Sequence, residues 1–186
     1  YSLICIIHGD GDYLYHDTNG NEYYADSEVL DEIKLIAEQN PFAEVFIFHQ
    51  KPASNFLFFF PQKDGEFYYY RNGNLVAQES YWREEEQSHL IPETKLYHQF
   101  NNNRNEQINM FLYFGHEIPE FKGDAYDYSY PHRDFTVHDL SAGLKYFKND
   151  STKFDLMILS TCYGGTPYTI STLGMFAKTI VASPGN

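Results

Sequence analysis

The stretch Phe154-Asp155-Leu156-Met157-Ile158-Leu159-Ser160-Thr161-Cys162 is an apolar run that ends in a thiol. Gly164 and Gly165 follow it, and Thr166-Pro167 then gives a helix-start signal. A buried strand that passes through a tight turn into a helix is typical of open α/β sheets, in which functional side chains gather where strands end. The start of a helix also stabilises a thiolate, so Cys162 is a candidate nucleophile.

A second apolar run, Ile108–Phe114, ends in Gly115-His116. If the two runs form neighbouring parallel strands, His116 and Cys162 lie at the same edge of one sheet. An imidazole changes its charge near neutral pH, so it can take a proton from a thiol. Each residue taken alone is more often part of a core or a loop, but together they form a candidate base and nucleophile.

The composition indicates a folded domain and argues against several classes of partner. The chain has 186 residues, of which 42% are hydrophobic and 18% aromatic, which is enough for a real core. The formal net charge of −13 argues against nucleic acid, whose phosphates need basic partners. The sequence contains no run of about 20 apolar residues and no signal peptide. The net charge also fits a secreted or cell-surface protein. Because Tyr1 already begins a strand, we expect the chain to be a trimmed or processed piece.

The two cysteines of the chain, Cys5 and Cys162, are both expected to be free. Cys5 lies within a run of isoleucines, where a thiol acts as a small core hydrophobe. A disulfide between the two would consume the candidate nucleophile, and two cysteines cannot form the disulfide framework of a small secreted scaffold.

Apolar residues at strand and helix spacing alternate along most of the chain. Strands are expected over 2–8, 44–49, 108–114, 154–161 and 179–183, and helices over 27–39, 92–103, 137–148 and 167–177. Thr136 and Asp139 form a capping box at the start of the third of these helices. Strands that alternate with helices predict a three-layer αβα sandwich with a mostly parallel sheet.

The segment from about 55 to 80 has a different composition, rich in aromatic residues, and predicts a small antiparallel hairpin inserted between the strands and helices of this pattern. Asn72-Gly73 is a strong two-residue turn signal between strands at 66–71 and 75–77, because both residues tolerate positive φ. Phe56–Phe60 is expected to be a further short strand. Its residues show little alternation, so its exposed face must be covered or it will aggregate.

Taken together, these features resemble the clan of cysteine peptidases with the caspase–hemoglobinase fold, and within it the clostripain family. The resemblance rests on the helix that follows Pro92-Glu93-Thr94, the strand into Gly115-His116, the helix Thr136–Phe147, and the strand Lys153–Leu159 ahead of Cys162. Element order matches over nearly the whole chain, whereas sequence similarity is confined to about Pro92–Gly185. The resemblance implies a single caspase-like peptidase domain over residues 1–186 that lacks its C-terminal part.

The resemblance implies an endopeptidase that hydrolyses peptide bonds through a thioester intermediate. Cys162 would be the nucleophile and His116 its general acid/base, and the backbone N–H groups of Cys162 and Glu117 would form the oxyanion hole. We place Ser160 and Ser183 in the wall of the pocket for the substrate's P1 residue. The implied partners are a protein or peptide substrate and a C-terminal fragment of the same precursor.

The sequence departs from the family pattern at three places. Glu117 stands where members have glycine after the histidine, which adds bulk and negative charge beside an oxyanion. Ser160 stands where arginine-preferring members often have aspartate, so position 160 does not supply the acidic P1 pocket that a basic side chain needs. The chain also stops at Asn186, although further elements usually follow the strand that ends at Ser183.

No cofactor or metal is predicted. Some relatives use calcium, but nothing in this sequence specifies a calcium site. The stretch His8-Gly9-Asp10-Gly11-Asp12 is similar to a metal-binding loop, yet it lacks the bidentate glutamate and the spacing of an EF-hand.

Two other functions are consistent with the sequence. The first is a caspase-like domain that no longer cleaves and instead binds a protein or peptide, which Glu117 and Ser160 favour. The second is a flavodoxin-like ligand binder, which is weaker because neither a dinucleotide-binding glycine motif nor a phosphate-binding loop is present.

Overall fold

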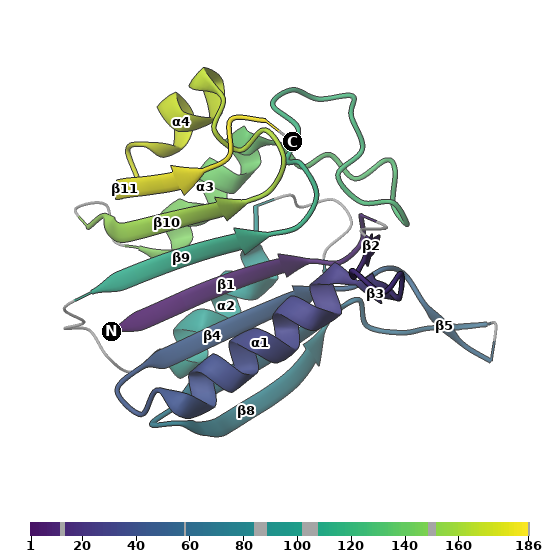
Figure 1. The fold of residues 1–186 in the computed structure, drawn as a ribbon, viewed down its shortest axis with the longest axis horizontal. Coiled ribbons are helices and arrows are strands. Elements are labelled where there is room, and N and C mark those ends of the chain that lie inside the picture. Colours follow the sequence, from purple (N-terminus) through teal and green to yellow (C-terminus); the bar gives the residue numbers. More distant parts are fainter. Residues whose placement is uncertain (12–13, 58, 84–88, 102–107, 149–151, 186) are drawn as a thin grey trace.

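The computed structural model describes residues 1–11, 14–57, 59–83, 89–101, 108–148 and 152–185 (Figure 1). Within these residues, seven strands form one sheet in the order β11-β10-β9-β1-β4-β7-β8. The five strands from β11 to β4 run parallel, and β7 and β8 are antiparallel to their neighbours. Their bounds are β1 Ser2–His8, β4 Glu44–Gln50, β7 Gly65–Arg71, β8 Asn74–Tyr81, β9 Asn109–Phe114, β10 Phe154–Ser160 and β11 Ala177–Ala182.

Helices cover both faces of this sheet, which confirms the predicted three-layer fold. Helix α1 (Ala25–Gln39) packs on one face, where Leu30 and Ile33 contact the apolar cluster that includes Cys5 and Ile7. Helices α2 (Ile91–Phe100), α3 (Val137–Phe147) and α4 (Pro167–Leu173) contribute to the larger cluster on the other face.

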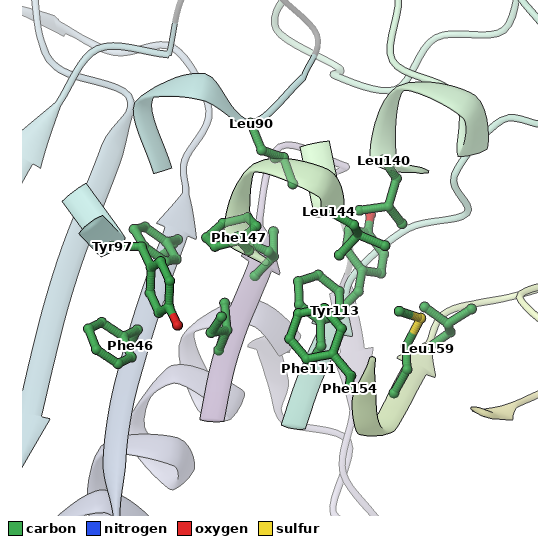
Figure 2. Close-up of a cluster of buried hydrophobic side chains, with 14 of the residues drawn as sticks. Phe46, Leu90, Tyr97, Phe111, Tyr113, Leu140, Leu144, Phe147, Phe154 and Leu159 are labelled. Carbon is green, nitrogen blue, oxygen red and sulfur yellow. The ribbon is translucent and has the colours of Figure 1, made fainter. Parts of the chain in front are cut away.

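The apolar runs of the sequence are continuous because the central strands are buried on both faces. In β1, Ile4 and Ile6 point to the larger cluster, while Cys5 and Ile7 point to the α1 side. Figure 2 shows the larger cluster, in which Phe111 and Phe154 of adjacent strands pack beneath Phe147 of α3. The predicted capping box starts α3, because Thr136 accepts the N–H of Asp139 while the Asp139 carboxylate accepts the N–H of Thr136.

The predicted antiparallel hairpin is present, and it extends the main sheet beyond β4. Tyr69 of β7 lies opposite Phe46 of β4, so the aromatic residues of the hairpin are core residues. The turn has positive φ at both Asn72 (53°) and Gly73 (74°), as the sequence predicted.

The single strand expected over Phe56–Phe60 is wrong. The chain instead turns back on itself between β5 (Asn55–Phe56) and β6 (Phe60–Pro61), which pair only with each other. Leu57 has a φ of 49°, so the backbone leaves the extended conformation in the middle of the aromatic run. Elsewhere β2 (Leu14–His16) and β3 (Glu22–Tyr24) form a second small antiparallel pair.

Two expected helix ends differ from the observed ones. The helix expected up to Asn103 ends at Phe100, and positions 102 and 103 lie outside the described residues. The last helix, expected up to Ala177, ends four residues earlier at Leu173, because Gly174 favours termination. The chain then enters β11 at Ala177. None of the helices in the described segments is long and apolar enough to cross a bilayer.

Replacing Gly73 by alanine tests the turn that joins β7 to β8. A Cβ there would lie 2.8 Å from the carbonyl oxygen of Glu38, in addition to the cost of positive φ. We expect Gly73→Ala to lower the free energy of unfolding by about 2–3 kcal/mol in urea titration, against about 1 kcal/mol for Gly20→Ala. Gly20 is the matched control because it also has positive φ (82°) but has open space around it. Equal losses in the two variants would contradict the close approach at Gly73.

Candidate active site

Neighbouring strands β9 and β10 bring the two candidate residues to one edge of the sheet. Phe114 lies opposite Ser160, and the N–H of Gly115 donates to the carbonyl of Ser160 at 3.2 Å. His116 and Cys162 each come two residues after this last pair. They therefore lie at equivalent positions beyond adjacent parallel strands, where α/β sheets carry functional side chains.

The backbone around His116 is closely packed against the end of β1. Gly115 has a φ of 149°, and a Cβ there would lie 2.7 Å from the Cβ of His8, so only glycine fits. The hydroxyl of Tyr113 donates to the carbonyl of His116 at 3.0 Å. The His116 side chain itself is exposed. The sequence thus gives this imidazole a fixed backbone and an accessible ring.

Cys162 lies in the turn between β10 and α4. The next residue, Tyr163, has a φ of 53°, a conformation uncommon for non-glycine residues and often found at functional sites. Thr166 then caps α4 by accepting the N–H of Thr169 at 3.2 Å. The thiol is half-buried, in contrast to that of Cys5, which is fully buried. Both cysteines are free, as predicted.

Two adjoining cavities lie at this edge. The first, of about 420 Å³, is lined by His116 and Tyr163 together with Glu117, Glu120, Asp124 and other residues of the loop that follows β9. The second, of about 350 Å³, is lined by Cys162, Ser160 and Ser183 among apolar and hydroxyl side chains, and none of the described residues that line it is charged. Tyr163 follows Cys162 directly, so the chain at the thiol borders both cavities.

The structure thus brings the predicted pocket residues Ser160 and Ser183 to the same cavity as the thiol. His116 and Glu117 lie in the adjoining cavity. In the described part of the chain, no hydrogen bond joins the thiol of Cys162 to the ring of His116. Catalytic hydrogen bonds are often long without substrate, so the pairing of these groups stays a prediction.

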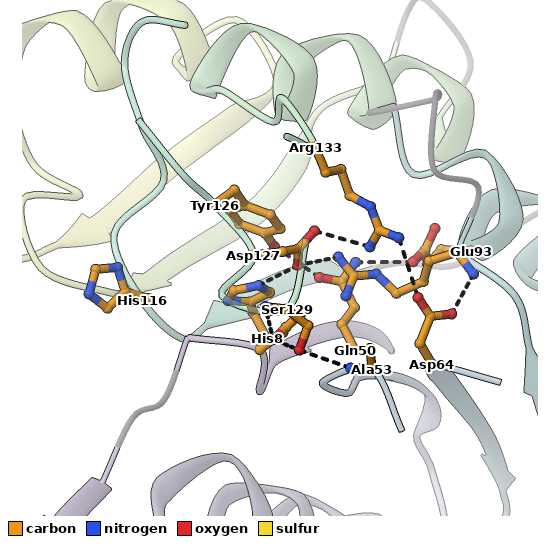
Figure 3. A network of polar contacts seen from close by, with 12 residues as sticks. His8, Gln50, Ala53, Asp64, Glu93, His116, Tyr126, Asp127, Ser129 and Arg133 are labelled. Carbon is orange, nitrogen blue, oxygen red and sulfur yellow. Dashed lines mark hydrogen bonds and ion pairs between the residues drawn. The ribbon is translucent and has the colours of Figure 1, made fainter. Parts of the chain in front are cut away.

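A buried polar network lies beside this site and includes residues of the loop after β9 (Figure 3). Its centre is Asp127, which is fully buried and bonds Arg83 at 2.6 Å, His8 at 3.0 Å and Arg133 at 3.0 Å. Arg133 also reaches Asp64 at 3.4 Å. The ring of Tyr126 stacks on His8 with 3.9 Å between ring centroids.

Electrostatics fix the protonation states in this network. Burial alone would raise the pKa of Asp127, but the hydrogen bond with His8 and the charge of Arg83 outweigh it and lower the pKa to about 2. Burial lowers the pKa of His8 to about 4, against the opposing effect of Asp127. Asp127 is therefore a carboxylate and His8 a neutral donor through Nε2. Its Nδ1 has no partner among the described residues.

The network holds the loop that walls the first cavity. Asp127 and Ser129 belong to this loop, and Ser129 donates to Asp10 from its N–H (2.9 Å) and its hydroxyl (2.7 Å). His8 and Asp10 lie at the end of β1, so they tie the loop to the centre of the sheet. His8 ends a strand as expected, but its burial excludes direct contact with a substrate.

Sequence reasoning did not find this network. Its charged members come from distant segments, and no short motif joins them. No feature of the sequence marks Asp127 as the centre of such a network. The possible metal-binding loop His8–Asp12 includes Asp12, which lies outside the described residues. Among the described residues, no group of three ligating side chains could hold a metal ion.

Comparison with known proteins relates the fold to one family of peptidases. No protein-family model and no curated protein sequence matches the chain. Among solved structures, it is similar to a secreted C11 cysteine protease from Bacteroides thetaiotaomicron in complex with an irreversible peptide inhibitor, with 10% identity and a TM-score of 0.63 over 98% of this chain and 48% of that one.

Two further structures agree. A second structure of a secreted C11 protease from Bacteroides thetaiotaomicron, "iotapain", gives 9% identity and a TM-score of 0.61 over 100% of this chain and 52% of that one. An inactive zymogen C11 protease from Parabacteroides distasonis gives 16% identity and a TM-score of 0.57 over 98% of this chain and 47% of that one. The chain thus spans about half the length of these proteases. This similarity confirms the predicted clostripain-type fold. At sequence identities this low, the similarity is one of fold alone.

The network predicts a loss of stability in acid. Between pH 6.5 and about 4, His8 takes up a proton in the unfolded chain but not in the folded one. The free energy of unfolding therefore falls as pH is lowered through this range, by about 3 kcal/mol for His8. Urea titrations of His8→Gln should lack this contribution, whereas His16→Gln, at an exposed histidine, should keep it. Parallel pH profiles for wild type and His8→Gln would contradict the assignment.

Proposed function

We propose that the chain is the catalytic part of a cysteine endopeptidase in which Cys162 and His116 act as a dyad. The observation that carries this proposal is the register of two adjacent parallel strands, with Phe114 opposite Ser160, beyond which the two residues follow at equal distance. The likeness of nearly the whole chain to C11 cysteine proteases supports the reaction class.

In the proposed reaction, the Cys162 thiol transfers its proton to His116 and the sulfur attacks the peptide carbonyl carbon. The N–H groups of Cys162 and Glu117 stabilise the resulting oxyanion. The C–N bond then breaks as His116 returns the proton to the leaving amine, and a thioester remains. A water molecule, deprotonated by His116, hydrolyses the thioester and releases the acid and the thiol.

The cavity at Cys162 favours a neutral P1 residue. Among the described residues that line it, Ser160, Ser183 and apolar side chains, none carries a charge that could pair with an arginine, a lysine or an aspartate. Burial of an unpaired charge is costly, so charged P1 residues are disfavoured. The absence of aspartate at position 160 agrees with this preference.

Proposed substrates are proteins or peptides, and the proposed place of action is outside the cell. The second inference rests on the two similar Bacteroides proteases described as secreted. The negative charge of the chain is compatible with such a setting but does not define it.

A panel of fluorogenic peptides with Asn, Ala, Arg, Lys or Asp at P1 tests the proposal on the full-length protein. We expect cleavage after Asn or Ala to exceed cleavage after the charged residues by at least about tenfold. Cys162→Ala and His116→Ala should each remove cleavage while the urea midpoint changes little, and Cys5→Ala is the control that should retain cleavage.

The panel has two outcomes that contradict the proposal. Cleavage that survives in Cys162→Ala would exclude this nucleophile. Peptides that bind the wild-type protein without turnover would favour the other function considered, a caspase-like binding module, for which Glu117 beside the oxyanion position is the specific structural argument.

A further inference from the structure

The turn between β5 and β6 exposes an unusual amount of apolar surface. We call the described residues of this segment, 52–57 and 59–62, the aromatic finger. Among its described residues, Phe56, Leu57, Phe59 and Phe60 are 57%, 62%, 84% and 63% exposed. In Figure 1 the finger projects away from the body of the molecule, on the side of the sheet where β1 and β9 end. These four side chains therefore lie on one protrusion rather than scattered over the surface.

The base of the finger is firmly attached to the rest of the molecule. The N–H of Lys51 donates to the carbonyl of Asp64 at 2.7 Å, and the N–H of Gln62 donates to the carbonyl of Ser54 at 2.8 Å. The N–H of Ala53 donates to the hydroxyl of Ser129, which in turn donates to Asp10 of the buried network. The finger is thus held in place by the same contacts that fix the loop beside His116.

The charge pattern of the finger differs from that of the whole chain. Residues 52–62 contain no charged side chain, and a lysine stands at each end, Lys51 and Lys63, in a chain of net charge −13. Lys51 pairs with Glu66 at 2.6 Å, while Lys63 is exposed and donates to the carbonyl of Ser80. The tip of the finger is therefore neutral and apolar, and lysines flank the two ends of the segment. Residues 52–62 include no aspartate or glutamate.

Area and shape discriminate between a protein partner and a lipid. The four side chains expose on the order of 500 Å² of apolar surface. A stable protein interface buries about 800 Å² on each partner, and a convex tip would also need a matching hole. An amphiphilic layer adapts to a convex tip, accepts aromatic rings below its headgroups and places cationic side chains at headgroup level.

We propose that the aromatic finger inserts into the headgroup region of a phospholipid bilayer. Its own backbone supports this, because the N–H of Phe59 donates to the carbonyl of Phe56 within the turn, which reduces the cost of leaving water. Insertion would direct the edge of the sheet that carries His116 and Cys162 toward the membrane surface. The proposal does not depend on whether that edge cleaves peptides.

Flotation of the full-length protein with phosphatidylcholine vesicles tests the proposal. We expect the wild type to float with the vesicles, and the variant Phe59→Ser/Phe60→Ser to have a partition coefficient at least about tenfold lower. Phe42→Ser is the matched control, since Phe42 is 85% exposed but lies in the turn between α1 and β4, and should float as the wild type does. Binding should persist in 0.5 M NaCl, because apolar insertion is not screened by salt.

Four flotation results would overturn the proposal. The wild type does not float with the vesicles, the variant Phe59→Ser/Phe60→Ser floats as well as the wild type, or Phe42→Ser loses as much flotation as that variant. The fourth is loss of binding in 0.5 M NaCl, which would indicate that charge alone adsorbs the protein to the vesicles. Sedimentation velocity without lipid covers the other occupant, a second copy of the chain. If the wild type is a dimer and the finger variant is a monomer, the finger contacts a second copy of the chain and not a lipid.

Discussion

The register between β9 and β10 is the constraint on which the rest of the structure depends. Phe114 lies opposite Ser160, and the hydrogen bond from the N–H of Gly115 to the carbonyl of Ser160 continues the pairing one residue past the end of β9. A shift by one residue would turn Phe111 and Met157 away from the cluster beneath α3. Packing in the core therefore determines where His116 and Cys162 lie, although neither residue contributes to that core.

Much of this frame could be predicted from sequence because it depends on local patterns. Buried runs such as Phe154–Ser160 give central strands, the capping box at Thr136 starts α3, and Asn72-Gly73 makes the tight turn. The positions of His116 and Cys162 at strand ends follow from the same patterns. Apolar content alone predicts the wrong structure at Phe56–Phe60, because Leu57 has positive φ and the side chains of Phe56, Leu57, Phe59 and Phe60 are exposed to water.

The buried network around Asp127 could not be predicted, because its energetics depend on residues distant in sequence. In the sequence, nothing distinguishes Arg83 and Arg133 from other arginines. The fold buries both side chains around the carboxylate of Asp127. A buried charge is stable only when it is paired, so these contacts specify one position for the loop that walls the His116 cavity. The same network reaches the base of the aromatic finger through Asp10 and Ser129. One polar cluster thus orients the cavity and the finger relative to the sheet.

The most direct test of the central claim is the rate at which iodoacetamide alkylates each cysteine at pH 6, followed by mass spectrometry of the folded protein. Cys5 is an internal reference, because burial raises the pKa of its thiol and shields it from reagent. If His116 and Cys162 act as a pair, Cys162 reacts much faster than Cys5, and His116→Ala slows it at least about tenfold. Alkylation of Cys162 that is no faster than that of Cys5, or that does not change in His116→Ala, would contradict the pairing.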